Sequence, residues 1–129
     1  VDVDKFKTLN DEHGHDAGDL GVHWVAHTIQ SVVPEHGTAC RLGGDEFLAV
    51  LPDFDANQAA ALAEKLRHNI ETAVGKPAEI PKLLTLSIGL ATREPSADYD
   101  RTQFLRHADE AMYASKRSGR NRVSRANAA

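Results

Sequence analysis

A pair of adjacent glycines stands near the middle of the chain, between two short apolar segments at residues 38–42 and 46–51. Adjacent glycines permit a tight reversal of the backbone, so Gly43 and Gly44 predict a β-hairpin. A hairpin turn does not require the two carboxylates that follow the glycines in "RLGGDEFLAV". The acids therefore indicate either a decorated surface turn or a site that binds a cation.

Apolar residues recur at three-and-four spacing on both sides of the hairpin, which is typical of amphipathic helices. The first helix is predicted to begin at Asp19 and to end before Pro34. The second follows Asp55, a good N-cap residue, and ends at Gly75. The stripes expected to face the core are Val22, Val25, Ala26, Ile29, Val32 and Val33 in the first helix, and Ala59, Leu62, Ala63, Leu66, Ile70 and Val74 in the second.

The remaining segments complete an alternating order of strands and helices. In chain order they are a strand at 1–4, a partly looped polar stretch at 5–18, a strand at 83–92, a helix at 103–118, a short strand at 121–124 and a disordered tail at 125–129. The first six elements follow the βαββαβ order of a ferredoxin-like sheet. We therefore predict an α/β fold, an α+β sandwich with an added C-terminal helix and short strand.

In a ferredoxin-like sheet the first and third strands are central, adjacent and antiparallel, so the end of the first meets the start of the third. This topology gathers acidic residues at one end of the sheet, namely Asp2, Asp4, Asp45 and Glu46. Such a cluster of oxygen ligands binds a hard divalent cation, Mg²⁺ or Mn²⁺, which acts on phosphate groups. The alternative is a hairpin turn with solvated acids beside it.

The composition limits the class of protein and its surroundings. With 129 residues, of which 41% are hydrophobic and 26% charged, the chain suits one globular domain. A net charge of −4 argues against a general nucleic-acid binder. The single cysteine, Cys40, favours a reducing compartment, and no apolar run approaches the roughly 18 residues of a membrane span. We therefore expect a cytoplasmic location, either alone or as the cytoplasmic domain of a larger protein.

Basic residues are concentrated at two places where a phosphate-containing ligand could be held. Lys5 and Lys7 follow the first strand directly, and the backbone amides around Phe6 can wrap a phosphate. A second group closes the last helix and comprises Lys116, Arg117, Arg120 and Arg122. The alternative for the second group is that it complements the helix dipole, as basic residues at helix ends commonly do.

The polar stretch "NDEHGHDAGD" offers side chains that match the hydrogen-bonding edge of guanine. Guanine presents N1–H and the 2-amino group as donors, and O6 and N7 as acceptors. Asp accepts from the N1 edge, and Asn serves both kinds of edge. The candidates are Asn10, Asp11, Asp16 and Asp19. The alternative is a polar loop with acids that cap the following helix.

Four blocks of the sequence resemble the GGDEF family, the bacterial diguanylate cyclases: "VDVDKFKTLNDEHGHDAGD", "RLGGDEF", "LTLSIGLA" and "ADEAMYASKRSGRNRV". The resemblance implies a palm-like sheet related to nucleotidyl cyclases, in agreement with the βαββαβ order. It also implies an enzyme, a nucleotidyltransferase that joins two GTP molecules into the second messenger cyclic di-GMP and releases two pyrophosphates. In the family's reaction each 3′-hydroxyl attacks the α-phosphate of the other GTP.

The resemblance assigns the acids to a metal and to proton transfer. It implies that Asp2, the backbone carbonyl of Val3 and Asp45 hold Mg²⁺ or Mn²⁺. Asp45 would also be the general base, and Glu46 would help to position the metal or the hydroxyl. Lys7 would stabilise the charge that builds up in the transition state.

The resemblance also implies which residues contact GTP and how the domain assembles. The implied contacts are Phe6, Lys7, Lys116 and Arg120 for the phosphates, Asn10, His15 and Asp19 for the guanine, and Gly43 and Gly44 at the turn that the nucleotide covers. A single site holds one GTP, so catalysis would need two domains face to face in a homodimer. An upstream sensor or coiled coil commonly imposes this pairing in the family, and neither a nucleic acid polymer nor a membrane contact is implied.

The chain departs from the family's pattern at two places. Many members carry an Arg-x-x-Asp product-inhibition site that would fall on residues 34–37, where Pro34 and Gly37 stand instead. We therefore expect no feedback inhibition through that site. The family's usual opening helix and most of its first strand do not precede Val1, so the domain at residues 1–124 is expected to be truncated.

Other functions stay open on the sequence alone. The main alternative is a non-catalytic regulatory module that binds GTP or a partner protein, although such modules usually lack the acids of the signature. A nucleotidyl transferase with another substrate, such as an adenylyl cyclase, is a further alternative, and so is a fragment that cannot fold. The sequence identifies neither the input signal nor the preferred metal.

Overall fold

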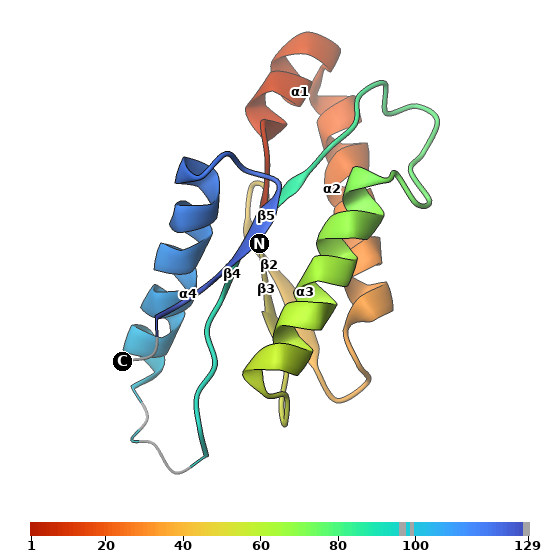
Figure 1. The fold of residues 1–129 in the computed structure, drawn as a ribbon. Coiled ribbons are helices and arrows are strands. Elements are labelled where there is room, and N and C mark those ends of the chain that lie inside the picture. The colour runs from red at the N-terminus through yellow and green to blue at the C-terminus, as the bar shows by residue number, and fades with distance from the viewer. Residues whose placement is uncertain (96–97, 99, 128–129) are drawn as a thin grey trace.

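The computed structural model describes residues 1–95, 98 and 100–127. In chain order its elements are β1 (Asp2–Val3), α1 (Phe6–His13), α2 (His15–Val32), β2 (Thr38–Gly43), β3 (Glu46–Val50), α3 (Ala56–Glu71), β4 (Leu86–Leu90), α4 (Arg101–Arg117) and β5 (Arg122–Arg125). The strands form one five-stranded sheet in the order β2-β3-β1-β4-β5 (Figure 1). Strand β1 is antiparallel to β3 and β4, β2 is antiparallel to β3, and β5 is parallel to β4. This arrangement confirms the predicted βαββαβ order and adds α4 and β5 after it.

Helices cover both faces of the sheet, with α2 and α3 on one face and α4 on the other (Figure 1). Neighbouring residues of a strand point to opposite faces of the sheet, so the strand register shows which side chains share a face. Val3 pairs with Leu86, and both side chains are buried in the core. Asp2 is in register with Glu46 and Ser87 and points to the opposite face. The acids of the central strands therefore lie on the face that α4 covers.

The apolar stripes predicted for the two long helices are largely confirmed. The buried core includes Val22, Val25 and Ile29 of α2 and Ala63, Leu66 and Ile70 of α3. Asp55 caps α3 as predicted, because its side chain accepts a hydrogen bond from the Gln58 amide, and Gln58 Oε1 accepts one from the Asp55 amide in return. Val74 does not belong to the stripe: it is 57% exposed, because α3 ends at Glu71.

The segment between β1 and α2 differs from the prediction. Residues 5–18 are predicted to be partly loop, yet α1 occupies Phe6–His13 and α2 begins at His15. Helix α1 buries only Leu9, and Phe6 and Leu9 are its two apolar residues, which are too few to establish a helical repeat from the sequence. Gly14, at φ 86°, separates the two helices, because glycine adopts this conformation readily.

The C-terminal strand lies one residue later in the chain than predicted. Strand β5 extends to Arg125, and the Ala126 amide donates a hydrogen bond of 2.7 Å to the Leu90 carbonyl. Residues 125 and 126 therefore do not belong to the disordered tail predicted at residues 125–129, and residues 128 and 129 lie outside the described ranges. Within those ranges, no helix has the length and apolar character that a membrane crossing requires.

Close packing between α4 and β4 brings distant residues together. A Cβ atom on Gly89 would lie 2.1 Å from the Ala108 carbonyl oxygen and 2.1 Å from the Met112 nitrogen, so the helix backbone rests directly on the strand. Ser115 strengthens the contact by donating a hydrogen bond of 2.8 Å to the Ile88 carbonyl. The C-terminal turn of α4 is thereby brought to β1, where one of its side chains forms an ion pair.

Candidate active site

The end of β1 meets the turn of the β2–β3 hairpin, as the predicted topology requires. The Val3 amide donates a hydrogen bond of 3.1 Å to the Asp45 carbonyl. Gly44 has φ 53°, and its carbonyl accepts hydrogen bonds of 2.9 and 2.6 Å from the Arg41 guanidinium. The turn is therefore fixed from within the hairpin, and it holds Asp45 beside the last residues of β1.

Asp2 and Asp45 form a pair of carboxylates at this junction. Asp2 is 4% exposed, and Asp45 is half-buried. Burial raises the pKa of Asp45 to about 6, and a hydrogen bond with Asp2 and the negative charge of Asp2 add to the effect. The Asp45 carboxyl therefore keeps its proton to a higher pH than an ordinary aspartate does.

Lys116 at the end of α4 supplies one positive charge to the pair. Its ammonium group donates a hydrogen bond to the Asp2 carboxylate. Partial burial lowers the pKa of Lys116, but the hydrogen bond and the charge of Asp2 raise it by more, so the pKa lies above its ordinary value. One ammonium beside two carboxylates leaves an excess of negative charge that a divalent cation would neutralise.

The donor set at the pair fits a hard divalent cation. Asp2 and Asp45 offer carboxylate oxygens, and the Val3 backbone is hydrogen-bonded next to them. Among the described residues, no group of three or more His, Cys, Asp or Glu side chains converges to form a complete metal cage. Mg²⁺ and Mn²⁺ bind through oxygen and keep several waters, so they suit an incomplete set of this kind. The remaining ligands would be water or substrate oxygens.

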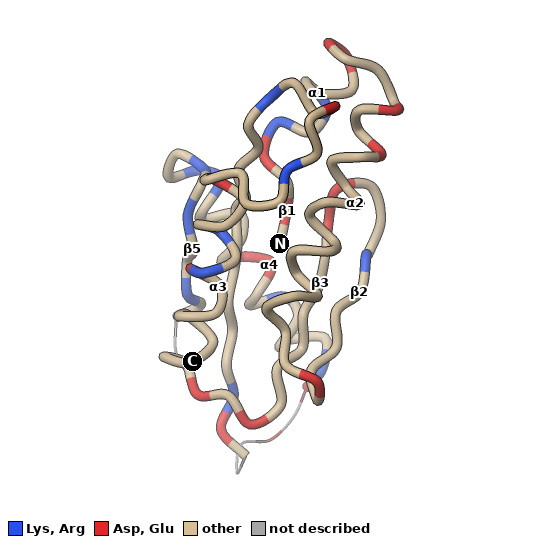
Figure 2. Tube along the Cα trace, turned by 90° about the vertical axis from the view of Figure 1, so that its right-hand side faces the viewer, with Lys and Arg blue, Asp and Glu red and all other residues tan. Residues whose placement is uncertain are grey.

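A cavity of about 170 Å³ opens at the acid pair. It is lined by Asp2, Val3, Asp4, Lys5, Phe6, Lys7, Asp45, Lys116 and Arg120. Its basic side chains come from the segment after β1 and from the end of α4, and Lys and Arg continue along β5 and the turn before it (Figure 2). The cavity therefore joins an acid pair that could hold a cation to a group of basic residues, a combination that suits a polyphosphate ligand.

The structure brings together most of the predicted site residues. The described lining contains the predicted Asp2, Val3, Phe6, Lys7, Asp45, Lys116 and Arg120. Glu46 is half-buried in register with Asp2 but is not among the lining residues. Gly43 and Gly44 form the exposed end of the hairpin, also outside that lining. The lining therefore leaves the roles predicted for Glu46 and the glycines untested.

The residues predicted to contact guanine lie on α1 and α2, outside the cavity lining; they are Asn10, His15 and Asp19. Asn10 packs against Gly18, where a Cβ atom would lie 1.7 Å from Asn10 Oδ1. That oxygen is buried and has no hydrogen-bond partner within the described part of the chain. His15 and Asp19 are exposed at the start of α2. Contact of the three residues with a base stays a prediction.

The prediction that Asp4 belongs to the acid cluster that binds a cation is wrong. The side chain is 5% exposed and lines the cavity, but its oxygens accept hydrogen bonds from Thr85 Oγ1, Ser87 Oγ and the Asn121 amide. Asp4 therefore serves as a buried acceptor and is not free to bind a cation. Sequence reasoning missed its partners, although Ser87, a polar residue within the apolar β4, is a signal that a buried acceptor lies nearby.

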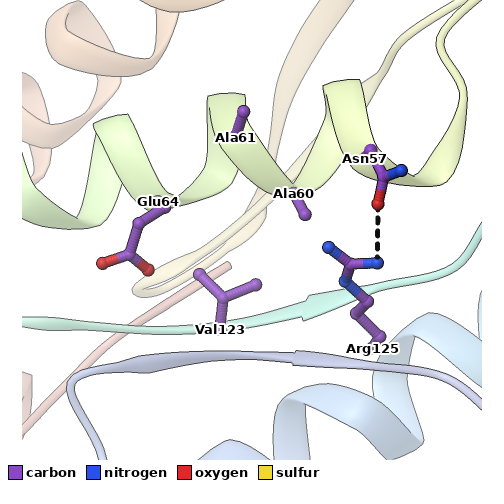
Figure 3. A pocket seen from close by; sticks show the side chains of 6 residues that line it. All are labelled: Asn57, Ala60, Ala61, Glu64, Val123 and Arg125. Atoms are coloured by element: carbon purple, nitrogen blue, oxygen red, sulfur yellow. Dashed lines mark hydrogen bonds between the residues drawn. The ribbon is translucent and has the colours of Figure 1, made fainter.

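A larger groove of about 420 Å³ lies between α3 and β5 (Figure 3). Its described lining is Asn57, Ala60, Ala61, Glu64, Val123 and Arg125. Arg125 Nη1 donates a hydrogen bond of 3.2 Å to Asn57 Oδ1, as the dashed line in Figure 3 shows. The groove lacks the paired acids and the group of basic residues of the smaller cavity within the residues described. Chemistry, rather than volume, therefore identifies the smaller cavity as the candidate site.

Comparison with known proteins agrees with this geometry. Residues 1–122 match the family described as "Diguanylate cyclase, GGDEF domain". The chain is 38% identical over 125 residues to the probable diguanylate cyclase DgcT of Escherichia coli K12. It is 40% identical over 124 residues to the diguanylate cyclase DosC of the same organism. Each alignment covers 95% of this chain but 27% and 26% of the relatives, so the chain spans about a quarter of their length.

Solved structures show the same fold. The GGDEF domain of DgcB from Caulobacter crescentus, in complex with c-di-GMP, has a TM-score of 0.88 at 35% identity, with 98% of this chain and 75% of that chain covered. The active GGEEF domain of a diguanylate cyclase from Vibrio cholerae has a TM-score of 0.88 at 33% identity, with 99% and 80% covered. The match over nearly the whole chain shows that this protein belongs to the GGDEF family of diguanylate cyclase domains.

Proposed function

We propose that this chain is a catalytic domain that condenses two GTP molecules into cyclic di-GMP and releases two pyrophosphates. The observation that carries the proposal is the cavity in which the Asp2–Asp45 pair faces basic residues from two distant parts of the chain. Phosphoryl transfer requires acidic side chains that hold a divalent cation to lie close to basic side chains that hold the phosphates. Relatives that are named diguanylate cyclases support the same reaction.

In this proposal Asp2, the Val3 carbonyl and Asp45 would hold Mg²⁺ or Mn²⁺, and Glu46 lies next to Asp2 as a further carboxylate. When bound, such a cation neutralises charge on the reacting phosphate and makes a bound hydroxyl more acidic. The acid pair supports this role, because burial and mutual repulsion raise the pKa of Asp45 and a divalent charge would relieve both effects.

Asp45 accepts the proton of the 3′-hydroxyl that attacks the α-phosphate. Asp45 suits this role because it lies in the cavity lining, next to the basic residues that would hold the reacting phosphate. The proton moves to Asp45 as the new phosphorus–oxygen bond forms, and the bond to the leaving pyrophosphate breaks. Glu46 helps to orient the hydroxyl from the neighbouring strand position.

Lys7, Lys116 and Arg120 bind the triphosphate, with Phe6 beside them in the cavity lining. Negative charge increases on the α-phosphate oxygens and on the departing pyrophosphate during the reaction. Fixed cations at those positions lower the barrier because they interact more strongly with the transition state than with bound GTP. The guanidinium of Arg120 is suited to two phosphate oxygens at once.

Asn10, His15 and Asp19 select guanine, because an Asp carboxylate accepts hydrogen bonds from N1–H and the 2-amino group. The hairpin turn leaves room for the nucleotide. A Cβ atom on Gly43 or Gly44 would meet nothing within 4 Å, so the space next to the turn is open to a ligand. This open space supports the predicted approach of the nucleotide to the two glycines.

The reaction needs two domains, since each domain binds a single GTP. We therefore propose that the chain acts as a homodimer, at least during catalysis. The solved coiled coil and GGDEF domain of DgcB from C. crescentus supports pairing by a neighbouring segment. The diguanylate cyclase SiaD from Pseudomonas aeruginosa, solved with its activator SiaC, supports control by a partner protein.

The test is to incubate the purified chain with GTP and Mg²⁺, or Mn²⁺, and to identify products by chromatography with mass detection. We expect cyclic di-GMP from the natural sequence. Loss of the general base in Asp45→Ala should lower the rate by at least about 100-fold. Glu35→Ala, which changes an exposed acid in the α2–β2 turn, is the matched control and should keep its activity.

Activity that survives in Asp45→Ala would remove Asp45 from the proposed mechanism. If neither the natural sequence nor Asp45→Ala forms product, the assay is repeated with a dimeric coiled coil fused to each chain, which brings two domains together. GTP binding without product in that fused dimer would identify a non-catalytic GTP-binding module instead of an enzyme.

A further inference from the structure

The turn between α4 and β5 carries Arg120 into the cavity, and its backbone conformation is uncommon. Arg120 has φ 66° and Asn121 has φ 47°, so two successive residues with side chains are in the left-handed region. Residues other than glycine rarely adopt this conformation, because Cβ crowds the following carbonyl oxygen. Such a backbone persists when contacts outside the turn hold it in place.

Asp4 holds the turn from the side of the sheet. Its Oδ2 accepts hydrogen bonds from the Asn121 amide at 3.0 Å and from Thr85 Oγ1 at 2.8 Å. Its Oδ1 accepts one of 2.6 Å from Ser87 Oγ. A buried carboxylate with donors on both oxygens is engaged in those contacts. The turn is thereby tied to the end of β1, the strand that also carries Asp2.

Asn121 is held a second time, through its side chain, by α3. Its Nδ2 donates a hydrogen bond of 3.0 Å to Glu71 Oε2, and its Oδ1 accepts one of 2.8 Å from Arg67 Nη1. Arg67 forms ion pairs with both Glu64 and Glu71. Hydrogen bonds from Asn121 and then from Arg67 lower the pKa of Glu71, so its carboxylate stays charged and keeps both contacts. Asn121 therefore connects β1 to α3 while it shapes the backbone next to Arg120.

We propose that Asp4 and Asn121 are positioning residues that hold Arg120 at the phosphate-binding side of the cavity. The inference rests on the proposed function, since it requires the cavity to bind a nucleoside triphosphate. Neither residue has to touch the nucleotide, because together they set the backbone from which the guanidinium reaches it. A pre-ordered Arg120 loses less conformational freedom on binding than one on a mobile turn, and its affinity for phosphate is correspondingly higher.

The first test compares two acids that both pair with Arg67. Glu71 also bonds Asn121, and Glu64 is the matched control on the same helix. Calorimetry with Mg²⁺ present gives the affinities for a non-hydrolysable GTP analogue and for GMP, which lacks the β- and γ-phosphates. We expect Glu71→Ala to lower the affinity for the GTP analogue about fivefold and to leave the affinity for GMP unchanged. Glu64→Ala should change neither affinity.

The second test is a double-mutant cycle between Asn121 and Arg120. Asn121→Gly removes the side-chain bonds to α3 but keeps the positive φ, which glycine adopts freely. We expect Asn121→Gly to lower the affinity for the GTP analogue about fivefold when Arg120 is present. In the Arg120→Ala background the same change should have no further effect, because the positioning acts through the guanidinium.

Three outcomes separate the possibilities. The positioning role is overturned if Asn121→Gly lowers the affinity for the GTP analogue equally with and without Arg120. It is also overturned if the affinity for GMP falls as much as that for the GTP analogue. Either result would indicate a general effect on the fold. Melting temperatures of each variant check that the comparison is made between folded proteins, and Glu71→Ala repeats the test without a change in the turn. If Arg120→Ala leaves the affinity for the GTP analogue unchanged, the phosphate site of the proposed function fails instead.

Discussion

Asp2 and Asp45 lie where two negative charges destabilise the metal-free chain. Burial, with the hydrogen bond and charge of Asp2, raises the pKa of Asp45 from its ordinary value of 3.8 to about 6. Between these pH values Asp45 binds more protons in the folded chain than in the unfolded chain. Its contribution to the free energy of unfolding therefore falls as the pH rises from about 4 to about 6. A carboxylate stabilised by a salt bridge has the opposite pH dependence.

We expect Asp45→Asn to stabilise the metal-free chain above pH 6. The gain is about 1 kcal/mol after allowance for solvent screening of the partly exposed Asp45, or roughly 3 °C in melting temperature. It should shrink towards about pH 4, where the natural carboxyl group is protonated. Circular dichroism melts with a chelator at about pH 4.5 and 7.5 measure both values. The idea fails if Asp45→Asn melts no higher than the natural sequence at the upper pH, with exposed Glu35→Gln as control.

At the scale of elements, the site depends on how closely α4 approaches the sheet. The helix backbone lies on Gly89 without an intervening side chain. This contact places Lys116 at Asp2 and directs the following turn, with Arg120, towards the cavity. The position of one helix therefore decides whether these basic residues meet the acid pair.

We expect Gly89→Ala to displace α4, since the added methyl would lie 2.1 Å from backbone atoms of the helix. The cost is about 2–3 kcal/mol in the free energy of unfolding, measured by urea titration, because the helix cannot yield without losing its own packing. Affinity for GTP should fall as well. Gly75→Ala is the control: its Cβ meets nothing within 4 Å at φ 70°, so only backbone strain of about 1 kcal/mol applies. Equal stability of the two variants would contradict the role given to this contact.

The helices differ in whether a sequence pattern can predict them. The α2 and α3 helices have apolar stripes that match the core, and Asp55 supplies a cap that can be recognised from the sequence. Helix α1 has a single buried residue, Leu9, and its polar composition resembles that of a loop. Its helical state depends on packing against α2, which no local pattern expresses.

At the scale of the whole molecule, the α2–β2 turn lies outside the lining of the candidate site. In the α2–β2 turn the Gly37 amide donates a hydrogen bond of 2.8 Å to the Pro34 carbonyl. These two residues occupy the positions where many members of the family carry the Arg and Asp of the product-inhibition site. Neither offers a charged side chain that could bind a cyclic dinucleotide phosphate.

We therefore expect cyclic di-GMP not to inhibit this protein through the α2–β2 turn. Initial rates are measured with saturating GTP, which removes competition at the active site, while cyclic di-GMP is raised to saturation. The rate should change by less than about twofold, since neither Pro34 nor Gly37 offers a cationic side chain to the product phosphates. Strong inhibition under these conditions would show that another surface binds the product.

The sequence by itself determined the order of the strands and the longer helices, without α1, and the meeting of Asp2 with Asp45. Apolar periodicity and turn residues are local signals, and the βαββαβ order permits few arrangements of its strands. Only the tertiary structure decided the roles of the other polar residues. The hydrogen bonds of Asp4 with Ser87 and Asn121 join residues 83 and 117 positions apart, and that of Lys116 with Asp2 joins residues 114 apart. The contact with Ser87 depends on the pairing of β1 with β4, and those of Asn121 and Lys116 depend on how α4 packs on the sheet. No short stretch of sequence carries that information.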